Sequence, residues 1–178
     1  MAVETGSVAA EIGGETSTAT IERVENQIVV QAGPINATIG GLTGEGESSA
    51  LDNDGNVRLN PGDAVRINAS GFEPGSTVEL WLFSTPTRLG TVTVPADGAV
   101  TGNFEIPEET ATGAHRIAIV ARTTEGEEAT LAVGILVGSG EDADSVSIWL
   151  IAPPIALAVL AALVLPATRR RRAARVPT

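Results

Sequence analysis

Short stretches of the chain alternate apolar and polar residues, and turn residues separate them. Four stretches place aliphatic side chains on a single face, namely Ala64–Ser70, Thr77–Ser84, Arg116–Arg122 and Leu131–Val137. A period of two is the pattern of a half-buried β-strand. Turn signals such as Pro74-Gly75 and Asp97-Gly98 fall between such runs. The pattern therefore predicts an all-β domain over residues 51–137, a two-sheet sandwich of about seven strands.

Residues 1–50 have a different composition, rich in Gly, Ser, Thr, Ala and Glu. A segment of this kind buries little apolar surface, which favours disorder. Two runs inside it, Gln27–Gln31 and Ile35–Ile39, have the composition of strands. We expect them to be either the remnant of a preceding domain or extra edge strands of the sandwich.

The C-terminal part carries a long run without charge. Residues 145–168 contain 24 uncharged residues. Bilayer hydrocarbon is about 30 Å thick and a helix rises about 1.5 Å per residue, so about 20 apolar residues span it. The run predicts one transmembrane helix. Its expected anchoring residues are Trp149, Pro153, Pro154, Leu157, Leu160 and Leu163.

Basic residues after this run predict its direction. They are Arg169, Arg170, Arg171, Arg172 and Arg175. Because basic flanks stay on the cytoplasmic side, residues 169–178 are expected to form a cytoplasmic tail and the β-domain to lie outside the cell membrane. Residues 138–144 (GSGEDAD) are expected to be a short acidic linker between domain and span.

Charge and composition exclude several classes of function. The 11 basic residues are all Arg. Six of them precede the uncharged run, together with all 22 Asp and Glu, so this part of the chain has a formal charge of −16. The tail has a formal charge of +5. A nucleic-acid partner is not expected, because phosphate backbones require clustered Lys and Arg. Cysteine is absent, which excludes disulfides, thiolate nucleophiles and cysteine-based zinc sites.

An ordered series of short motifs carries a family resemblance. Gly71–Val92 reads GFEPGSTVELWLFSTPTRLGTV, and Ala96–Gly98, Ile106-Pro107 and Thr112–Arg116 (TGAHR) follow it. The series resembles the bacterial immunoglobulin-like domains of surface proteins from high-GC Gram-positive bacteria. The resemblance implies an immunoglobulin-like β-sandwich that acts as a spacer or adhesin module without catalytic residues.

Two candidate sites follow from the residues. The spacing of four polar residues is like that of a calcium loop, although the Gly and the final Glu of such a loop are not in place. They are Asp52, Asp54, Asn56 and Asp63, and a polar turn explains them equally well.

Trp81 and Phe83 alternate with the aliphatic positions of their strand and are expected to point outward, where they would bind a protein or surface polymer. The alternative is that the N-terminal segment covers them, for example through Val29, Val30 and Ile35, or that they face a neighbouring domain.

Catalysis has little support in the sequence. His115 shares the parity of Ile117 and Ile119 and is expected to cap the inner face of its strand. No nucleophile and orienting partner are recognisable beside it, so we expect neither enzymatic activity nor a cofactor. The expected function is structural spacing or adhesion by a membrane-anchored surface protein. The alternative is a sensory or assembly subunit that associates with a membrane complex through its single span.

Overall fold

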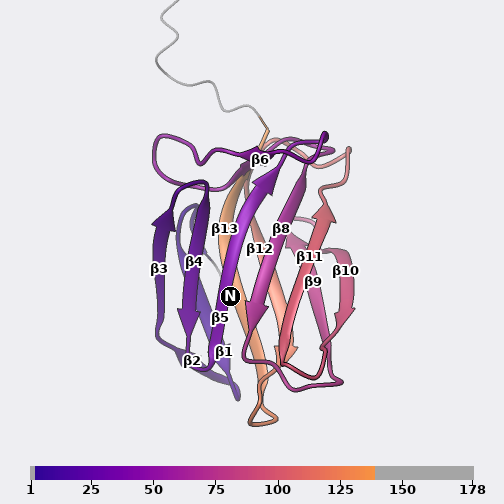
Figure 1. Cartoon of the computed structure of the whole chain (residues 1–178). Helices are drawn as coiled ribbons and strands as arrows, with labels where there is room; N and C mark the ends of the chain where they lie inside the picture. The colour runs from indigo at the N-terminus through magenta and orange to yellow at the C-terminus, as the bar shows by residue number, and fades with distance from the viewer. Residues whose placement is uncertain (1–2, 139–178) are drawn as a thin grey trace, which may run out of the picture. The chain divides into compact units, whose positions relative to one another are not determined.

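The computed structural model describes residues 3–138 of the chain. These residues form thirteen β-strands in two sheets (Figure 1). The predicted all-β class and the two sheets are therefore confirmed. Within the described residues there is no helix of the length and hydropathy needed to cross a membrane. The predicted span, its anchoring residues and the arginine-rich tail all lie outside this part of the chain.

The larger sheet has seven strands. Its order is β10 (Thr87–Thr93), β9 (Thr77–Phe83), β12 (Gly113–Arg122), β13 (Glu128–Val137), β1 (Val8–Ile12) and β2 (Glu15–Ser17), with β7 (Arg58–Leu59) paired to β13. All pairs are antiparallel except β7 with β13. The long β12 and β13 form a hairpin at the centre of this sheet.

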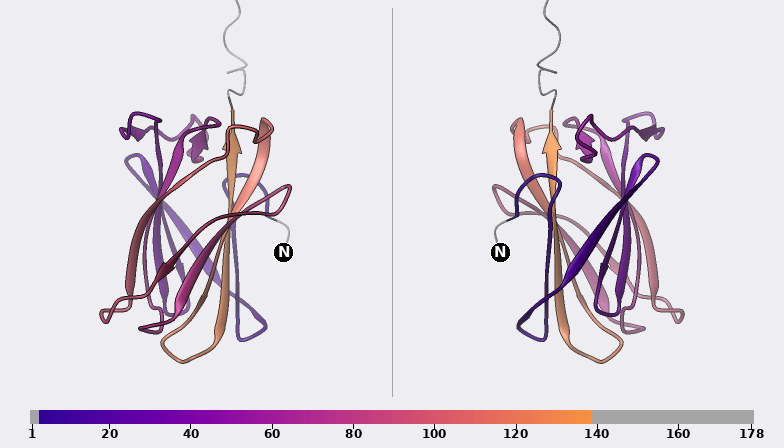
Figure 2. Two further views of the ribbon diagram at one scale, coloured as in Figure 1. Left: turned by 90° about the vertical axis from the view of Figure 1, so that its right-hand side faces the viewer. Right: turned by 90° about the vertical axis from the view of Figure 1, so that its left-hand side faces the viewer.

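The smaller sheet has six strands. Its order is β11 (Ala99–Glu105), β8 (Ala64–Ser70), β5 (Ile35–Leu42), β4 (Gln27–Ala32) and β3 (Ala19–Val24), with β6 (Ser48–Ser49) paired to β5. In Figure 1 this sheet lies in front of the larger one, and the side views of Figure 2 show the two layers facing each other.

Alternating side chains from both sheets form one hydrophobic core. In β9 the inward residues are Val78, Leu80 and Leu82, and in β8 they include Val65 and Ile67, all buried. Complete burial of one such side chain stabilises the fold by about 1.5–3 kcal/mol. The strands predicted from the period-two pattern are thus present with the predicted inner faces.

The expected boundary at residue 51 is wrong. Strand β1 pairs with β13, and β5 pairs with β8 over seven residue pairs, so the first 50 residues belong to the same two sheets. Ile28, Val30 and Ile39 are almost fully buried in the shared core. The run at Ile35–Ile39 does not form an edge strand, because β5 lies between β4 and β8. The sandwich therefore has thirteen strands in place of about seven.

The polar composition of this segment misled the prediction for a physical reason. In a two-sheet sandwich each strand turns one face to the core and the other face to water. About half of its residues can therefore be polar without any reduction of the apolar surface buried in the core. In β4 the buried residues Ile28, Val30 and Ala32 alternate with exposed or half-exposed ones. The short alternation was sufficient for strand formation despite the abundance of Ser, Thr and Gly around it.

Candidate functional site

Trp81 and Phe83 lie on the outer face of the larger sheet. Both side chains are half-buried, and they alternate along β9 with the fully buried Val78, Leu80 and Leu82. The predicted outward direction is therefore correct. A role of the two residues in binding stays a prediction.

The two aromatic rings form a pair held by charged neighbours. Their centroids are 6.3 Å apart and their planes are inclined by 28°. The Trp81 Nε1–H donates a 2.9 Å hydrogen bond to Oε2 of Glu79. The guanidinium of Arg116, on β12, lies 4.8 Å from the centre of the Phe83 ring, a favourable cation–π contact.

Arg88 completes this group from the other side of β9. It lies opposite Trp81 in the pairing of β10 with β9, and its Nη1 is 3.9 Å from Oε1 of Glu79. We call Glu79, Trp81, Phe83, Arg88 and Arg116 the aromatic strip. The residues of the aromatic strip thus lie on the three adjacent strands β9, β10 and β12. Contacts with charged side chains orient its two aromatic rings.

Val29, Val30 and Ile35 of the N-terminal segment do not cover the strip. Val30 and Ile35 belong to the smaller sheet and are buried in the core between the two layers. Val29 alternates with Val30 and so lies on the outer face of that other sheet. The alternative in which these three residues shield Trp81 and Phe83 is therefore wrong.

Small residues continue the same face beyond Trp81. Ala118 of β12 pairs with Trp81, Ala132 of β13 pairs with Ala118, and Ala9 of β1 pairs with Ala132. Ala118 and Ala132 are only 2% and 1% exposed, so larger groups cover this part of the outer face.

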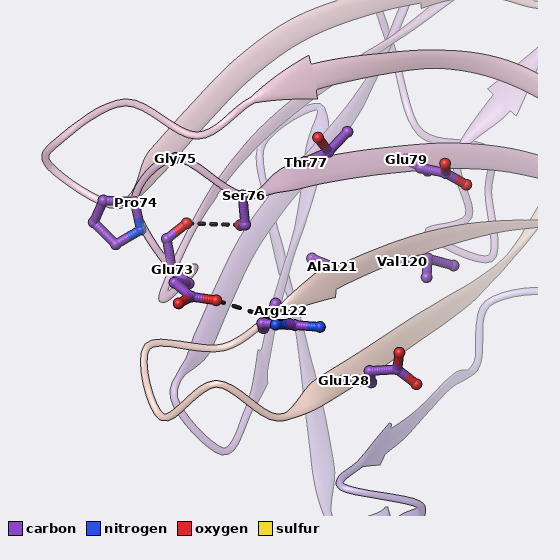
Figure 3. Close-up of a pocket in the computed structure, with 10 residues that line it drawn as sticks. All are labelled: Glu73, Pro74, Gly75, Ser76, Thr77, Glu79, Val120, Ala121, Arg122 and Glu128. Carbon is purple, nitrogen blue, oxygen red and sulfur yellow. Dashed lines mark hydrogen bonds and ion pairs between the residues drawn. The ribbon is translucent and has the colours of Figure 1, made fainter.

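A groove adjoins the strip at the start of β9. It encloses about 610 Å³, and its lining includes Glu73, Ser76, Thr77, Glu79, Arg122 and Glu128 (Figure 3). Arg122 Nε lies 3.8 Å from Oε2 of Glu73, and the Ser76 hydroxyl donates a 2.6 Å bond to the Glu73 carbonyl. Glu79 belongs to both groove and strip, so the two form one continuous surface along β9.

His115 lies where its parity predicted. It is 7% exposed, the Ser84 Oγ is 2.9 Å from its Nδ1, and its Nε2 is 2.7 Å from the carbonyl oxygen of Ala111. A carbonyl only accepts, so Nε2 carries the proton and Nδ1 accepts from Ser84 in the neutral ring. This serine–histidine pair is oriented by a neutral carbonyl, whereas hydrolytic triads use a carboxylate that stabilises the imidazolium. The geometry favours a structural role.

The four calcium candidates are divided between two turns. Asp52 accepts hydrogen bonds from the backbone N–H of Asp54 and Asn56 and from the Asn56 amide. Asp63 accepts from the backbone N–H of Asn60 and Gly44 and from the Asn60 amide. Between residues 3 and 138, no three Asp, Glu or His side chains are grouped as a metal site requires. The bonding pattern is that of turn-stabilising side chains.

The sequence identified only the centre of the site. Glu79 shares the outward parity of Trp81 and could have been added from the sequence. Arg88 and Arg116 could not, because only strand pairing brings them beside β9. The groove depends on the turn before β9 and on the ends of β12 and β13, which are distant along the chain.

Comparison of the chain with models of known protein families and with curated protein sequences gave no match.

Proposed function

We propose that this protein is a membrane-anchored cell-surface module that presents a rigid, non-catalytic β-domain outside the cell for spacing or adhesion. The observation that carries the proposal is the continuity of the chain. The last core strand, β13, ends at Val137, and the 24-residue uncharged run begins at Ser145. Only residues 138–144 intervene, which span at most about 25 Å when fully extended.

The strand pairing supports an immunoglobulin-like arrangement of residues 57–137. In an immunoglobulin sandwich one sheet contains strands B and E, and the other contains C, F and G. Here β8 pairs with β11 in one sheet, while β9, β12 and β13 are neighbours in the other. Along the chain, the order β8, β9, β11, β12 and β13 is the same as the order B, C, E, F and G. Strands β1 to β5 extend both sheets beyond this pattern.

The charge of the domain supports an outward, water-facing position. Residues 3–138 carry 6 Arg and 19 Asp or Glu, a formal charge of −13. Such a surface remains soluble and repels anionic lipid headgroups. A domain tethered closely to a bilayer gains from this repulsion, because it disfavours collapse of the domain onto the membrane.

Alkaline extraction of membranes tests the anchor. The full chain is expected to remain in the membrane pellet after a sodium carbonate wash, whereas a variant without residues 145–168 is expected in the supernatant. Recovery of the full chain in the supernatant would contradict the proposal. Replacement of the run by 24 residues of unrelated apolar sequence is the control, and it should restore retention in the pellet.

A further inference from the structure

We infer that the aromatic strip is a binding site for an uncharged polysaccharide. This inference rests on the proposed function, because it names the class of partner that the outward-facing domain would hold. The class of partner is inferred from the atoms of the strip that remain available to a ligand.

The exposed part of Trp81 is its ring. Its single polar group, the Nε1–H, is already bonded to Glu79. A ligand therefore meets the π-face, whose negative potential attracts weakly positive C–H groups. The face of a sugar ring presents such C–H groups, and its rim presents hydroxyls. The Phe83 ring lies beside the indole, inclined to it by 28°, and the Arg116 guanidinium over this ring would meet a second sugar unit with N–H donors.

Hydrogen-bonding groups surround the rings at the places where hydroxyls would lie. Arg88 and Arg116 offer guanidinium donors on the two sides of β9, and the Glu79 carboxylate has lone pairs that can accept further hydrogen bonds. The groove beyond Glu79 adds the hydroxyls of Ser76 and Thr77 (Figure 3). Since a sugar hydroxyl both donates and accepts, this mixed set suits a polyol better than a purely apolar partner.

The strip is fixed before any ligand arrives. Strand β9 is bonded to β10 on one side and to β12 on the other. Glu79 holds the indole and Arg116 covers the Phe83 ring. Fixed side chains lose little conformational entropy on binding, which matters for sugars because each unit makes few strong contacts.

Extended peptides and anionic polymers fit this surface less well. Added peptide strands bind at a free sheet edge. The free edge nearest the strip is β10, so a strand added there would lie beyond Arg88 and not over the aromatic rings. Pro-rich peptides dock in grooves lined by aromatic side chains, whereas Trp81 and Phe83 lie side by side on a sheet face. The −13 charge of residues 3–138 repels nucleic acid and acidic glycans.

Fluorescence of the full chain in detergent micelles tests the inference. The protein has two tryptophans, so the Trp149→Phe variant leaves Trp81 as the only indole. We would titrate it with mixed-linkage β-glucan, galactomannan and N-acetylglucosamine oligomers, with polygalacturonate as the anionic comparison. At least one neutral polymer is expected to change the emission saturably, and polygalacturonate is expected to cause no change.

Variants assign the binding to the strip. In gels that contain the bound polymer, Trp81→Ala and Phe83→Ala are each expected to weaken retardation by roughly tenfold. Val24→Ala is the matched control, since Val24 is 45% exposed on β3 of the other sheet, and it should bind like the wild type. Circular dichroism melting of each variant separates lost binding from lost fold.

Three results would overturn the inference. They are absence of binding to every neutral polymer, equal binding by Trp81→Ala, and cross-linking from position 83 in intact cells that captures only proteins. The carbonate extraction keeps the two proposals distinguishable. A chain that stays in the membrane but binds no polysaccharide contradicts the polysaccharide site alone, whereas a chain released by carbonate contradicts the membrane anchor.

Discussion

Gly71 occupies a backbone position that no other residue fits. Its φ is +96°, and a Cβ at this position would collide with the carbonyl of Pro34, in the turn between β4 and β5. The next residue, Phe72, is fully buried and hydrogen-bonded to Gly98. The first glycine of the GFEPG motif therefore lets two turns approach one another while the phenylalanine fills the core.

Gly71→Ala is expected to lower the free energy of unfolding by about 3 kcal/mol or more, from left-handed backbone strain and steric overlap together. Gly75→Ala is the matched control. Its φ is +82° but no atom lies within 4 Å of the added Cβ, so only the strain of about 1–2 kcal/mol applies. Urea denaturation measures both, and equal losses would contradict the close approach at Pro34.

The acidic side chains of Asp52 and Asp63, before β8, accept hydrogen bonds within turns. Asp63→Ala is expected to destabilise the protein by about 1–3 kcal/mol, because three donors lose their acceptor. Asp54→Ala, at an exposed position, should change stability by less than about 0.5 kcal/mol. Thermal melting in excess EDTA and in calcium checks this. A melting temperature that calcium raises in the wild type but not in Asp63→Ala would restore the calcium site.

At the scale of elements, the N-terminal strands are necessary for the sandwich. Deletion of residues 1–50 removes strands β1 to β6, among them the partner of β8, and takes Ile28, Val30 and Ile39 out of the core. The shortened chain is expected to show no cooperative unfolding transition in near-ultraviolet circular dichroism. Deletion of residues 1–3 alone is the control and should leave the transition in place. Cooperative unfolding of the longer deletion within a few degrees of the wild type would instead support an independent domain at residues 51–137.

Gly134 connects the first strand to the last. Its N–H and carbonyl are bonded to Ser7 and Gly6, and a Cβ would collide with the carbonyl of Glu4. Gly134→Ala is expected to release residues 4–7 from β13 and to speed hydrogen exchange there, while the exchange of β8 stays slow. Unchanged protection of Ser7 in this variant would show that the segment accommodates the methyl group.

The elements that could be predicted from sequence are those with a complete inner face. Strand β8 alternates buried and unburied residues over its whole length, and the predicted range Ala64–Ser70 is the observed one. Strand β3 has no fully buried residue and β1 has one, and their other inward residues, Val8, Ile12, Ala19 and Ile21, are only partly buried, so the period-two signal of both strands is weak. Such strands form because β4 and β13 offer them backbone partners, and this information lies elsewhere in the chain.

The same distinction applies to the site. The outward direction of Trp81 follows from its own strand, whereas its neighbours Arg88 and Arg116 follow from the register of three strands. Parity within one strand is a local property, but register depends on how the whole sheet assembles. The aromatic pair was therefore predictable, and the charged groups that hold it were not.

At the scale of the whole molecule, the two-sheet domain and the uncharged run have complementary roles in the proposal. The turn at Thr123–Glu127 joins β12 and β13 at one end of the domain, and the chain leaves from the other end at Val137 (Figure 1). In the proposal, the sidedness of an anchor at residues 145–168 decides whether the aromatic strip faces the outside of the cell.

Labelling of single cysteines in intact cells tests this sidedness most directly, because the native chain has no cysteine and gives no background. Glu125→Cys places a thiol in the exposed β12–β13 turn, and Ala173→Cys places one in the arginine-rich tail. With a membrane-impermeant maleimide, the first variant is expected to be labelled in intact cells and the second only after permeabilisation. Labelling of Ala173→Cys in intact cells, with Glu125→Cys protected until permeabilisation, would contradict the display of this domain on the cell surface.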